Sequence, residues 1–164
     1  MLVVSNTSPI MNLAVVGMLD LLRQQFGEVI IPAAVVDELK LGTDYPGTGE
    51  IRSAMTTGWL HQVNLEDDRV AKALRRELDD GEAEAIALAL QLKIESILMD
   101  ERDGRSVAKS MGLVPIGVIG VLVRAKQNGD IDSVKEILNK LRDEAGFYIT
   151  DSLLKNILSE IGEL

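Results

Sequence analysis

Four side chains of the oxygen-bearing types Asn, Asp and Glu stand at points of the sequence where they could do chemistry. Asn6 follows one short apolar segment and Asp100 follows another, while Glu38 and Glu82 lie in segments of helical composition. The chain has no cysteine and one histidine, which excludes thiolate and histidine-rich metal sites and disfavours a histidine-based catalytic triad. Any metal bound here would therefore be held by oxygen atoms, which favours Mg²⁺ or Mn²⁺ over zinc.

Each of the four residues also has an ordinary structural role open to it. Asn6 is a residue type common in turns, and Glu38 could lie on a solvated helix face. Glu82 could stabilise the first turn of a helix through the helix dipole. Asp100 could cap a helix that begins near Arg102. The residue types alone therefore leave the structural and the chemical interpretations open.

Short apolar segments alternate along the chain with longer amphipathic ones. We expect strands at residues 2–4, 28–31, 59–63, 96–99 and 113–116. We expect helices at residues 8–16 (with Ser8 and Pro9 as N-cap and first residue), 19–26, 32–41, 67–78, 81–92, 102–111, 118–127, 131–144 and 150–161, and a short one ending at 57. This alternation predicts an α/β fold whose parallel sheet is covered by helices on both faces. No repeat or linker divides the chain, so we expect one domain over residues 1–164.

The ends of the expected strands select two of the four positions. In parallel α/β sheets, binding sites lie beyond the carboxyl ends of the strands. Asn6 and Asp100 occupy such positions. Glu84, two residues after Glu82, points about 200° away from it around a helix, so these two acids cannot face one site equally well.

The formal net charge of −9 argues against a general electrostatic affinity for nucleic acid. Positive charge near any site must therefore be local. Arg102 and Arg105 follow Asp100 closely, and a second basic group lies at residues 72–76. Solvated helix faces could account for both groups. Aromatic residues make up only 3% of the chain, so stacking is not expected to dominate any recognition of nucleic acid.

The apolar segment at residues 2–4 is too short for a secretory signal, and no basic residue precedes it. No other segment reaches the roughly 18 consecutive apolar residues that a membrane helix needs. We therefore expect a soluble, cytoplasmic protein with no role in membranes.

The sequence resembles the PIN-domain family in four motifs and in their order along the chain. The motifs are VVSNTSPI at residues 3–10, IIP at 30–32 with Glu38 after it, DGEAEAIALA at 80–89 and LMDER at 98–102. They are most similar to a small bacterial and archaeal branch of the family, whose uncharacterised members are related to the toxin nucleases of toxin–antitoxin pairs. The likeness extends from residue 2 to about residue 123 and weakens over the last two expected helices.

This resemblance implies a Rossmann-like, three-layer α/β/α sandwich with a central parallel sheet. It also implies a site for one or two Mg²⁺ or Mn²⁺ ions, because the family's catalytic and ligand pattern maps onto Asn6, Glu38, Glu82 and Asp100. Asp100 follows Glu82 by 18 residues, close to the interval usual in the family. This spacing favours Glu82 over Glu84 as the helix ligand.

The activity that the resemblance implies is metal-dependent cleavage of RNA phosphodiesters, with the metal activating a water molecule. Such a ribonuclease could be the toxin of a toxin–antitoxin pair, and a homodimer and a small antitoxin protein are the partners implied. Thr7 and Ser8 could bind a phosphate or a metal-bound water, with turn formation and helix capping as their alternative roles. Arg102 and Arg105 could contact the substrate backbone.

Asn6 departs from the family pattern, which has an aspartate at this position. An amide oxygen can still bind Mg²⁺, but the site loses one unit of negative charge, for which Glu101 and Asp103 could compensate. A second hypothesis is therefore a catalytically weakened or inactive PIN-like domain that binds protein or RNA. A third is a flavodoxin-like binding module, because residues 5–8 precede a helix as phosphate-binding loops do. The lack of glycine in that loop disfavours the third hypothesis.

Overall fold

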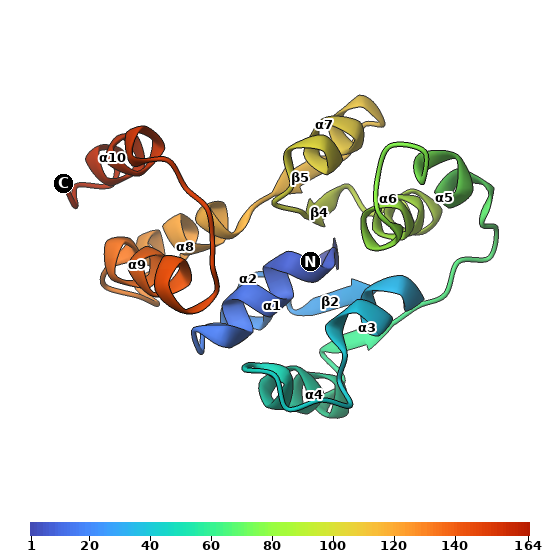
Figure 1. Ribbon diagram of the computed structural model, residues 1–164, viewed down its shortest axis with the longest axis horizontal. Helices are drawn as coiled ribbons and strands as arrows, with labels where there is room; N and C mark the ends of the chain where they lie inside the picture. The colour runs from blue at the N-terminus through green and yellow to red at the C-terminus, as the bar shows by residue number, and fades with distance from the viewer.

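Five short parallel strands form the centre of the computed structural model, which describes residues 1–164 (Figure 1). They are β1 (Leu2–Ser5), β2 (Glu28–Ile31), β3 (Leu60–Gln62), β4 (Ser96–Leu98) and β5 (Val114–Ile116). They lie side by side in the order β3-β2-β1-β4-β5, and every neighbouring pair is parallel. Val4 of the central strand is opposite Ile30 on one side and Ile97 on the other. The predicted parallel sheet is confirmed.

Ten helices connect the strands and cover the sheet. They are α1 (Thr7–Val15), α2 (Asp20–Phe26), α3 (Ala33–Leu39), α4 (Thr48–Thr57), α5 (Arg69–Leu74), α6 (Asp80–Leu92), α7 (Arg102–Ser110), α8 (Val118–Gln127), α9 (Val134–Glu144) and α10 (Asp151–Glu160). Figure 1 shows α8, α9 and α10 together at one end of the molecule and α5 and α6 at the other. None of these helices is both long and apolar enough to cross a lipid bilayer.

The strands send alternate side chains into two separate hydrophobic cores. Val3 and Leu98 belong to the core that also contains buried residues of α1, α2, α3, α4, α8 and α9. Val4 and Ile97 belong to the second core, which contains buried residues of α6 and α7. Successive side chains of a strand point to opposite faces of its sheet, so apolar residues at consecutive positions fill both cores. The three-layer α/β/α fold predicted from the sequence is therefore present.

Helix α6 lies against the centre of the sheet because its side chains there are small. Its alanines Ala83, Ala85 and Ala89 are fully buried in the second core, together with Ile86. Alanine has a high helix propensity and lets a helix approach a strand closely. The helix begins at Asp79, whose carboxylate accepts a hydrogen bond from the backbone of residue 82 at 2.8 Å. This N-cap hydrogen bond fixes where the first turn of α6 lies relative to the edge of the sheet.

Two predicted helix limits are wrong for local reasons. Helix α1 begins at Thr7 with Asn6 in the N-cap position, so Ser8 and Pro9 lie inside the helix and do not form the predicted cap pair. Helix α3 ends at Leu39, because Lys40 takes up the left-handed conformation with φ +51°. The predicted continuation of this helix to residue 41 is therefore not formed.

The helix predicted over residues 67–78 is shortened to α5. Arg69 donates from its backbone and its guanidinium to the Asp67 carboxylate, which holds the chain in a turn before the helix. After Leu74 the chain again makes a tight turn, with the residue 77 N–H donating to the Leu74 carbonyl at 3.0 Å. After this turn, Leu78 lies in the second hydrophobic core.

One carboxylate near the end of the chain is hydrogen-bonded to both α8 and the start of α9. Glu163 accepts hydrogen bonds from Lys126 at 2.9 Å, from the Ser133 hydroxyl at 2.7 Å and from the N–H groups of Val134 and Lys135 at 2.8 and 3.1 Å. It thereby caps α9 and ties the end of the chain to α8. Helix α10 has a single buried residue, Leu158, and Leu154 packs partly buried against the large core, so this polar contact adds to a small apolar attachment.

We predict that Glu163 makes α10 sensitive to acid. Burial by itself raises the pKa of Glu163, but its hydrogen bonds outweigh burial and lower the pKa from 4.5 to about 2. The stabilisation is therefore present above about pH 4.5 and is lost as pH falls through about 2. At neutral pH, Glu163→Gln should lower the free energy of unfolding by about 1–3 kcal/mol and reduce this pH dependence. Urea unfolding at several pH values measures both, with the exposed Glu160→Gln as control; equal pH dependence in both variants would contradict the assignment.

Candidate functional site

The chain changes sides in the sheet between β3 and β4, next to the central strand. From β1 it passes outward to β2 and β3, and it then returns to β4 on the other side of β1. In α/β proteins, ligands bind at such a crossover point, beyond the carboxyl ends of the strands. Asn6 and Asp100 follow β1 and β4, and the Asn6 N–H donates to the Leu98 carbonyl at 2.9 Å. The two residues predicted to share this edge therefore leave from neighbouring strands.

Asn6 and Asp100 each present one buried oxygen atom without a hydrogen-bond partner. Asn6 is 3% exposed, and its Oδ1 is unpaired. Asp100 Oδ1 accepts from the Val118 N–H at 2.8 Å, whereas Oδ2 is unpaired. Asp100 thus supports the start of α8 with one oxygen and leaves the other free. Its proposed alternative role, capping the helix near Arg102, is wrong, because Glu101 holds the N-cap position of α7.

Burial raises the pKa of the Asp100 carboxyl above its usual range. The hydrogen bond from the Val118 N–H and the positive charge of Arg105 act in the opposite direction, and the negative charge of Glu101 adds to the rise. A carboxylate removed from water is destabilised unless a positive charge or enough donors compensate it. Asp100 has one donor at one oxygen, so its charged form is only partly compensated.

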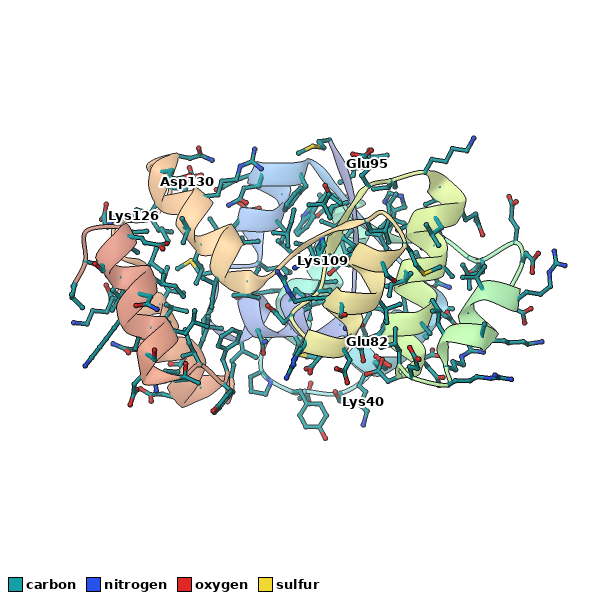
Figure 2. The ribbon with its side chains drawn as sticks, turned by 90° about the horizontal axis from the view of Figure 1, so that it is seen from above. Lys40, Glu82, Glu95, Lys109, Lys126 and Asp130 are labelled. Atoms are coloured by element: carbon teal, nitrogen blue, oxygen red, sulfur yellow. The ribbon has the colours of Figure 1, made fainter.

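Glu82 is the second acid buried at this edge, and it stands at the start of α6 (Figure 2). It is 6% exposed, and its Oε2 has no hydrogen-bond partner. Burial is the main cause that raises the pKa of Glu82 from 4.5 to about 7, followed by the hydrogen bond and charge of Asp79, with a further contribution from Glu101. A β-carbon on Gly104 would collide with Glu82 Oε2, so this side chain reaches from α6 to α7.

Glu84 takes a structural role in this conformation. Its carboxylate accepts from the Ala34 N–H at 3.1 Å, at the start of α3, and from Arg75 at 2.8 Å. Lys72, in the same basic group as Arg75, pairs with Asp68 at 3.3 Å. The second basic group predicted from the sequence is therefore largely neutralised by neighbouring acids. Glu84, and not Glu82, is one of these acids.

Glu38 differs from the other predicted site residues because protein groups satisfy both of its oxygens. The Thr7 hydroxyl donates to Oε1 at 2.6 Å, and the Gly81 N–H donates to Oε2 at 3.2 Å. A β-carbon on Gly81 would collide with this carboxylate. Glu38 thus ties α1, α3 and the first turn of α6 together, so the solvated helix face considered for it is wrong. Thr7 serves this contact rather than capping its own helix.

Three of the four predicted metal residues carry the unpaired oxygens of this edge. Only four buried side-chain polar atoms in the molecule lack a hydrogen-bond partner, and the fourth, Gln25 Oε1, lies on α2. Buried polar atoms are nearly always paired, so these three oxygens are exceptions that the fold leaves without a donor. Oxygen acceptors are the donor atoms that a hard divalent cation requires. In this conformation, however, no three acidic or histidine side chains lie close enough together to form a metal-binding group.

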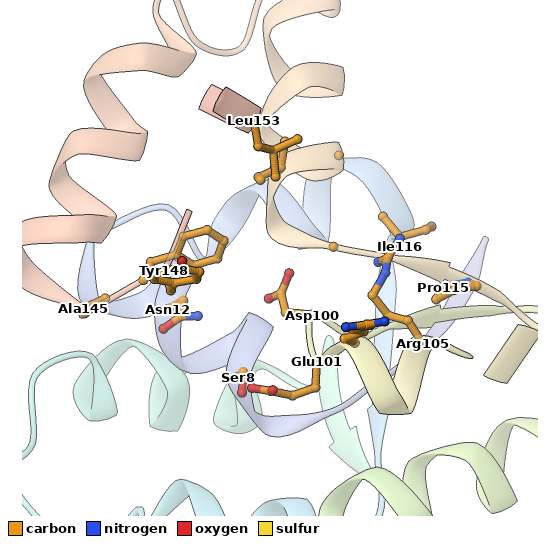
Figure 3. A pocket seen from close by; sticks show the side chains of 16 residues that line it. Ser8, Asn12, Asp100, Glu101, Arg105, Pro115, Ile116, Ala145, Tyr148 and Leu153 are labelled. Carbon is orange, nitrogen blue, oxygen red and sulfur yellow. The ribbon is translucent and has the colours of Figure 1, made fainter. Parts of the chain in front are cut away.

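An open cleft of about 910 Å³ lies beside Asp100. Ser8, Arg102 and Arg105, three of the predicted substrate contacts, line it, and Thr7 does not. Figure 3 shows Asp100 between Tyr148 on one side and Arg105 on the other. Further lining residues come from α1, from the start of α8, from the connection between α9 and α10 and from the first turn of α10: Asn12, Gly117, Ile119, Gly120, Ala145, Gly146, Phe147 and Leu153.

The sequence did not identify the α9–α10 connection as part of the site. It lies beyond residue 123, where the motifs end, and nothing local connects it with Asp100. Its one available signal is the adjacent pair Phe147 and Tyr148, two of only five aromatic residues in the chain. Asp103, considered as a compensating acid, lines a separate hollow with Glu77. Glu101 is the acid that does accompany Asp100 in the cleft.

The fold and the site define a class of protein, a parallel α/β protein with buried acids at the crossover edge of its sheet. A family model described as a PIN domain matches residues 2–163, so the chain belongs to the PIN-domain family. PIN domains are a nuclease-type fold that generally uses divalent metal ions.

One solved structure shows the same fold. It is a PilT N-terminus domain protein from the hyperthermophilic archaeon Sulfolobus solfataricus P2, with a TM-score of 0.55 and 22% sequence identity over 76% of this chain and 93% of that chain. No curated protein matches the chain significantly. The resemblance to PIN domains seen in the sequence is confirmed.

We predict that neutralising Glu82 stabilises the protein at high pH. Its pKa is raised to about 7, so its favourable contribution is present below about pH 4.5 and is lost as pH rises through 7. At pH above 7, Glu82→Gln should raise the free energy of unfolding by on the order of 1–3 kcal/mol, and the difference should vanish near the unfolded pKa. Urea unfolding across this range tests it, with Glu95→Gln, an exposed acid before β4, as control. A variant less stable than the wild type at high pH would contradict the unpaired state of Glu82.

Replacing Glu38 should lower the free energy of unfolding, in contrast to Glu82→Gln. Glu38→Ala leaves the Gly81 N–H and the Thr7 hydroxyl without an acceptor, which should lower the free energy of unfolding by about 1–3 kcal/mol. The neighbouring Asp37→Ala, at an exposed position without side-chain contacts, is the matched control and should change stability little. Chemical denaturation measures both variants; equal stabilities would show that Glu38 does not tie the three helices together.

Proposed function

We propose that this PIN domain is a metal-dependent ribonuclease that hydrolyses RNA phosphodiesters. One observation carries the proposal: the unpaired, buried oxygens Asn6 Oδ1, Glu82 Oε2 and Asp100 Oδ2 at the crossover edge of the sheet. Burying polar atoms without partners costs free energy, which a bound divalent cation would offset. The raised pKa values of Glu82 and Asp100 support the same assignment, because positive charge is what both carboxyls lack.

The residues of this site would have different roles in the reaction. One or two Mg²⁺ or Mn²⁺ ions, when bound, supply an activated water and stabilise the leaving oxygen. Asn6, Glu82 and Asp100 would hold the metal through their free oxygens. Glu38 would act mainly as a positioning residue, since it fixes the turn at Gly81 from which the neighbouring Glu82 projects.

Substrate contacts would come from the cleft beside the metal site. Arg102 and Arg105 make no ion pair with any acid of the protein, so their charges are available to RNA phosphates. Ser8, which also lines the cleft, would donate a hydrogen bond to the same backbone. The net charge of −9 argues against nucleic-acid binding by the molecule as a whole, but these two arginines place positive charge locally, in the cleft.

A second function is favoured by Asn6. Its neutral amide brings no charge to a site where Glu82 and Asp100 are the other contributors of free oxygens, so metal affinity should be lower than with aspartate. A PIN domain that retains RNA or protein binding with little catalysis fits this observation. A small antitoxin partner and a homodimer stay predictions from the family resemblance.

Cleavage assays with matched variants test the proposed activity. We expect weak cleavage of single-stranded RNA by the wild type with Mn²⁺ or Mg²⁺, loss of cleavage with chelator, and loss in Asp100→Ala. Asn6→Asp should cleave at least about tenfold faster at limiting metal, because one added negative charge strengthens cation binding. Asp103→Ala removes a nearby acid outside the cleft and serves as the control.

The outcomes separate the two functions. Absence of cleavage by both the wild type and Asn6→Asp with either metal would end the nuclease proposal. Cleavage by Asn6→Asp alone would support the weakened or inactive domain. Thermal unfolding with added Mn²⁺ provides an independent reading, since a metal that binds only the folded site raises the melting temperature in the wild type and less in Asp100→Ala.

A further inference from the structure

The connection between α9 and α10 forms the wall of the cleft opposite Arg105 (Figure 3). Gly146 takes up φ +67°, and the Phe147 N–H donates to the Leu141 carbonyl at 3.0 Å, so the chain turns sharply at the end of α9. Phe147 then packs against the large hydrophobic core. The turn and this anchor fix the position from which the next residue, Tyr148, projects.

Tyr148 is the most exposed of the large hydrophobic side chains, at 85%. An aromatic ring held on an anchored turn and facing solvent has no packing role in the fold. It lines the cleft, as does Leu153, which is 46% exposed. Tyr148 lies across the cleft from Arg105 (Figure 3).

The other side of the cleft carries two arginines, Arg102 and Arg105, next to the acids Asp100 and Glu101. Arg102 is exposed and has no hydrogen bond or ion pair to the protein, and Arg105 is held by the Met99 carbonyl at 3.0 Å with no carboxylate in contact. An aromatic ring on one wall and guanidinium groups without a carboxylate partner on the other match the two parts of a nucleotide. The volume of about 910 Å³ is ample for such a ligand, since pockets for small ligands measure roughly 300–1,000 Å³.

We propose that this cleft holds a single-stranded nucleic acid, with a base stacked on Tyr148 and the adjoining phosphates against Arg102 and Arg105. The proposal rests on the proposed nuclease function and adds to it the residue that receives the base. Bases within a duplex are already stacked on one another, so only an unpaired base can lie flat on this ring. Stacking on an exposed ring accepts every base, so Tyr148 selects for strandedness rather than sequence.

Binding in the presence of chelator separates this subsite from catalysis. Anisotropy of fluorescein-labelled short oligonucleotides at low salt gives the affinity for a single-stranded RNA, the same DNA sequence, the RNA duplex and an abasic strand with the same phosphates. Tyr148→Ala should weaken binding of both single strands about tenfold and leave the duplex and abasic strand unchanged. Tyr148→Phe should bind like the wild type, because the ring is kept.

Two further variants serve as matched controls. Tyr45→Ala removes the other exposed tyrosine, which is 57% exposed and lies outside the cleft, and should not change binding. Arg102→Gln should weaken binding to every strand, the abasic one included, because it removes a phosphate contact. Both positions and Tyr148 are exposed, so thermal unfolding should show all variants folded like the wild type.

Several results would overturn the proposal. They are unchanged single-strand affinity in Tyr148→Ala, equal loss on the abasic strand, and absence of binding to any strand by the wild type. A cleft that instead serves a protein partner would give the first or the third of these results. If binding depends on stacking but neither the wild type nor Asn6→Asp cleaves RNA, the nuclease function fails and the subsite stands. If RNA is cleaved and Tyr148→Ala changes neither the rate nor the affinity, the nuclease function stands and the subsite fails.

Discussion

The pairing of β1 with β4 is the contact on which the rest of the structure depends. It joins the outer pair β2 and β3 to β4 and β5, and it continues past the strand ends through the hydrogen bond from the Asn6 N–H to the Leu98 carbonyl. The strands are only three or four residues long, so the sheet itself contributes few hydrogen bonds. Burial of apolar side chains on both faces must supply most of the stability, and the same pairing brings Asn6 beside Asp100.

Close packing at glycine shapes the acidic edge. Gly81 leaves room for the Glu38 carboxylate, Gly104 for the oxygen of Glu82, and a β-carbon on Gly117 would stand 2.8 Å from Asp100 Oδ1. Each acid therefore lies against a backbone that a side chain would push away. Backbone this close excludes water from the carboxylates, which explains why Glu82 and Asp100 titrate above their usual range. Unpaired carboxylates destabilise this edge, and a bound cation of the kind proposed would offset that cost.

Much of the fold follows from local patterns in the sequence. The apolar segments around Val3, Ile30 and Ile97 become strands because consecutive apolar residues fill two cores. The wrong predictions are local as well: the helix over residues 67–78 is interrupted by turns that serve the core contact of Leu78. The two carboxyl ends selected from the sequence, Asn6 and Asp100, are neighbours because crossovers in parallel sheets follow general rules.

The sequence by itself determined the parallel α/β architecture, the family and the edge where Asn6 and Asp100 stand, because these depend on residue types and spacings within short stretches. Only the tertiary structure decided which oxygens are free. Glu38 is satisfied by Thr7, 31 residues away, and by Gly81, 43 residues away, while Glu82 meets no donor at Oε2. Whether a buried polar atom is paired depends on groups that folding brings from distant parts of the chain, and the same is true of the cleft wall at Tyr148.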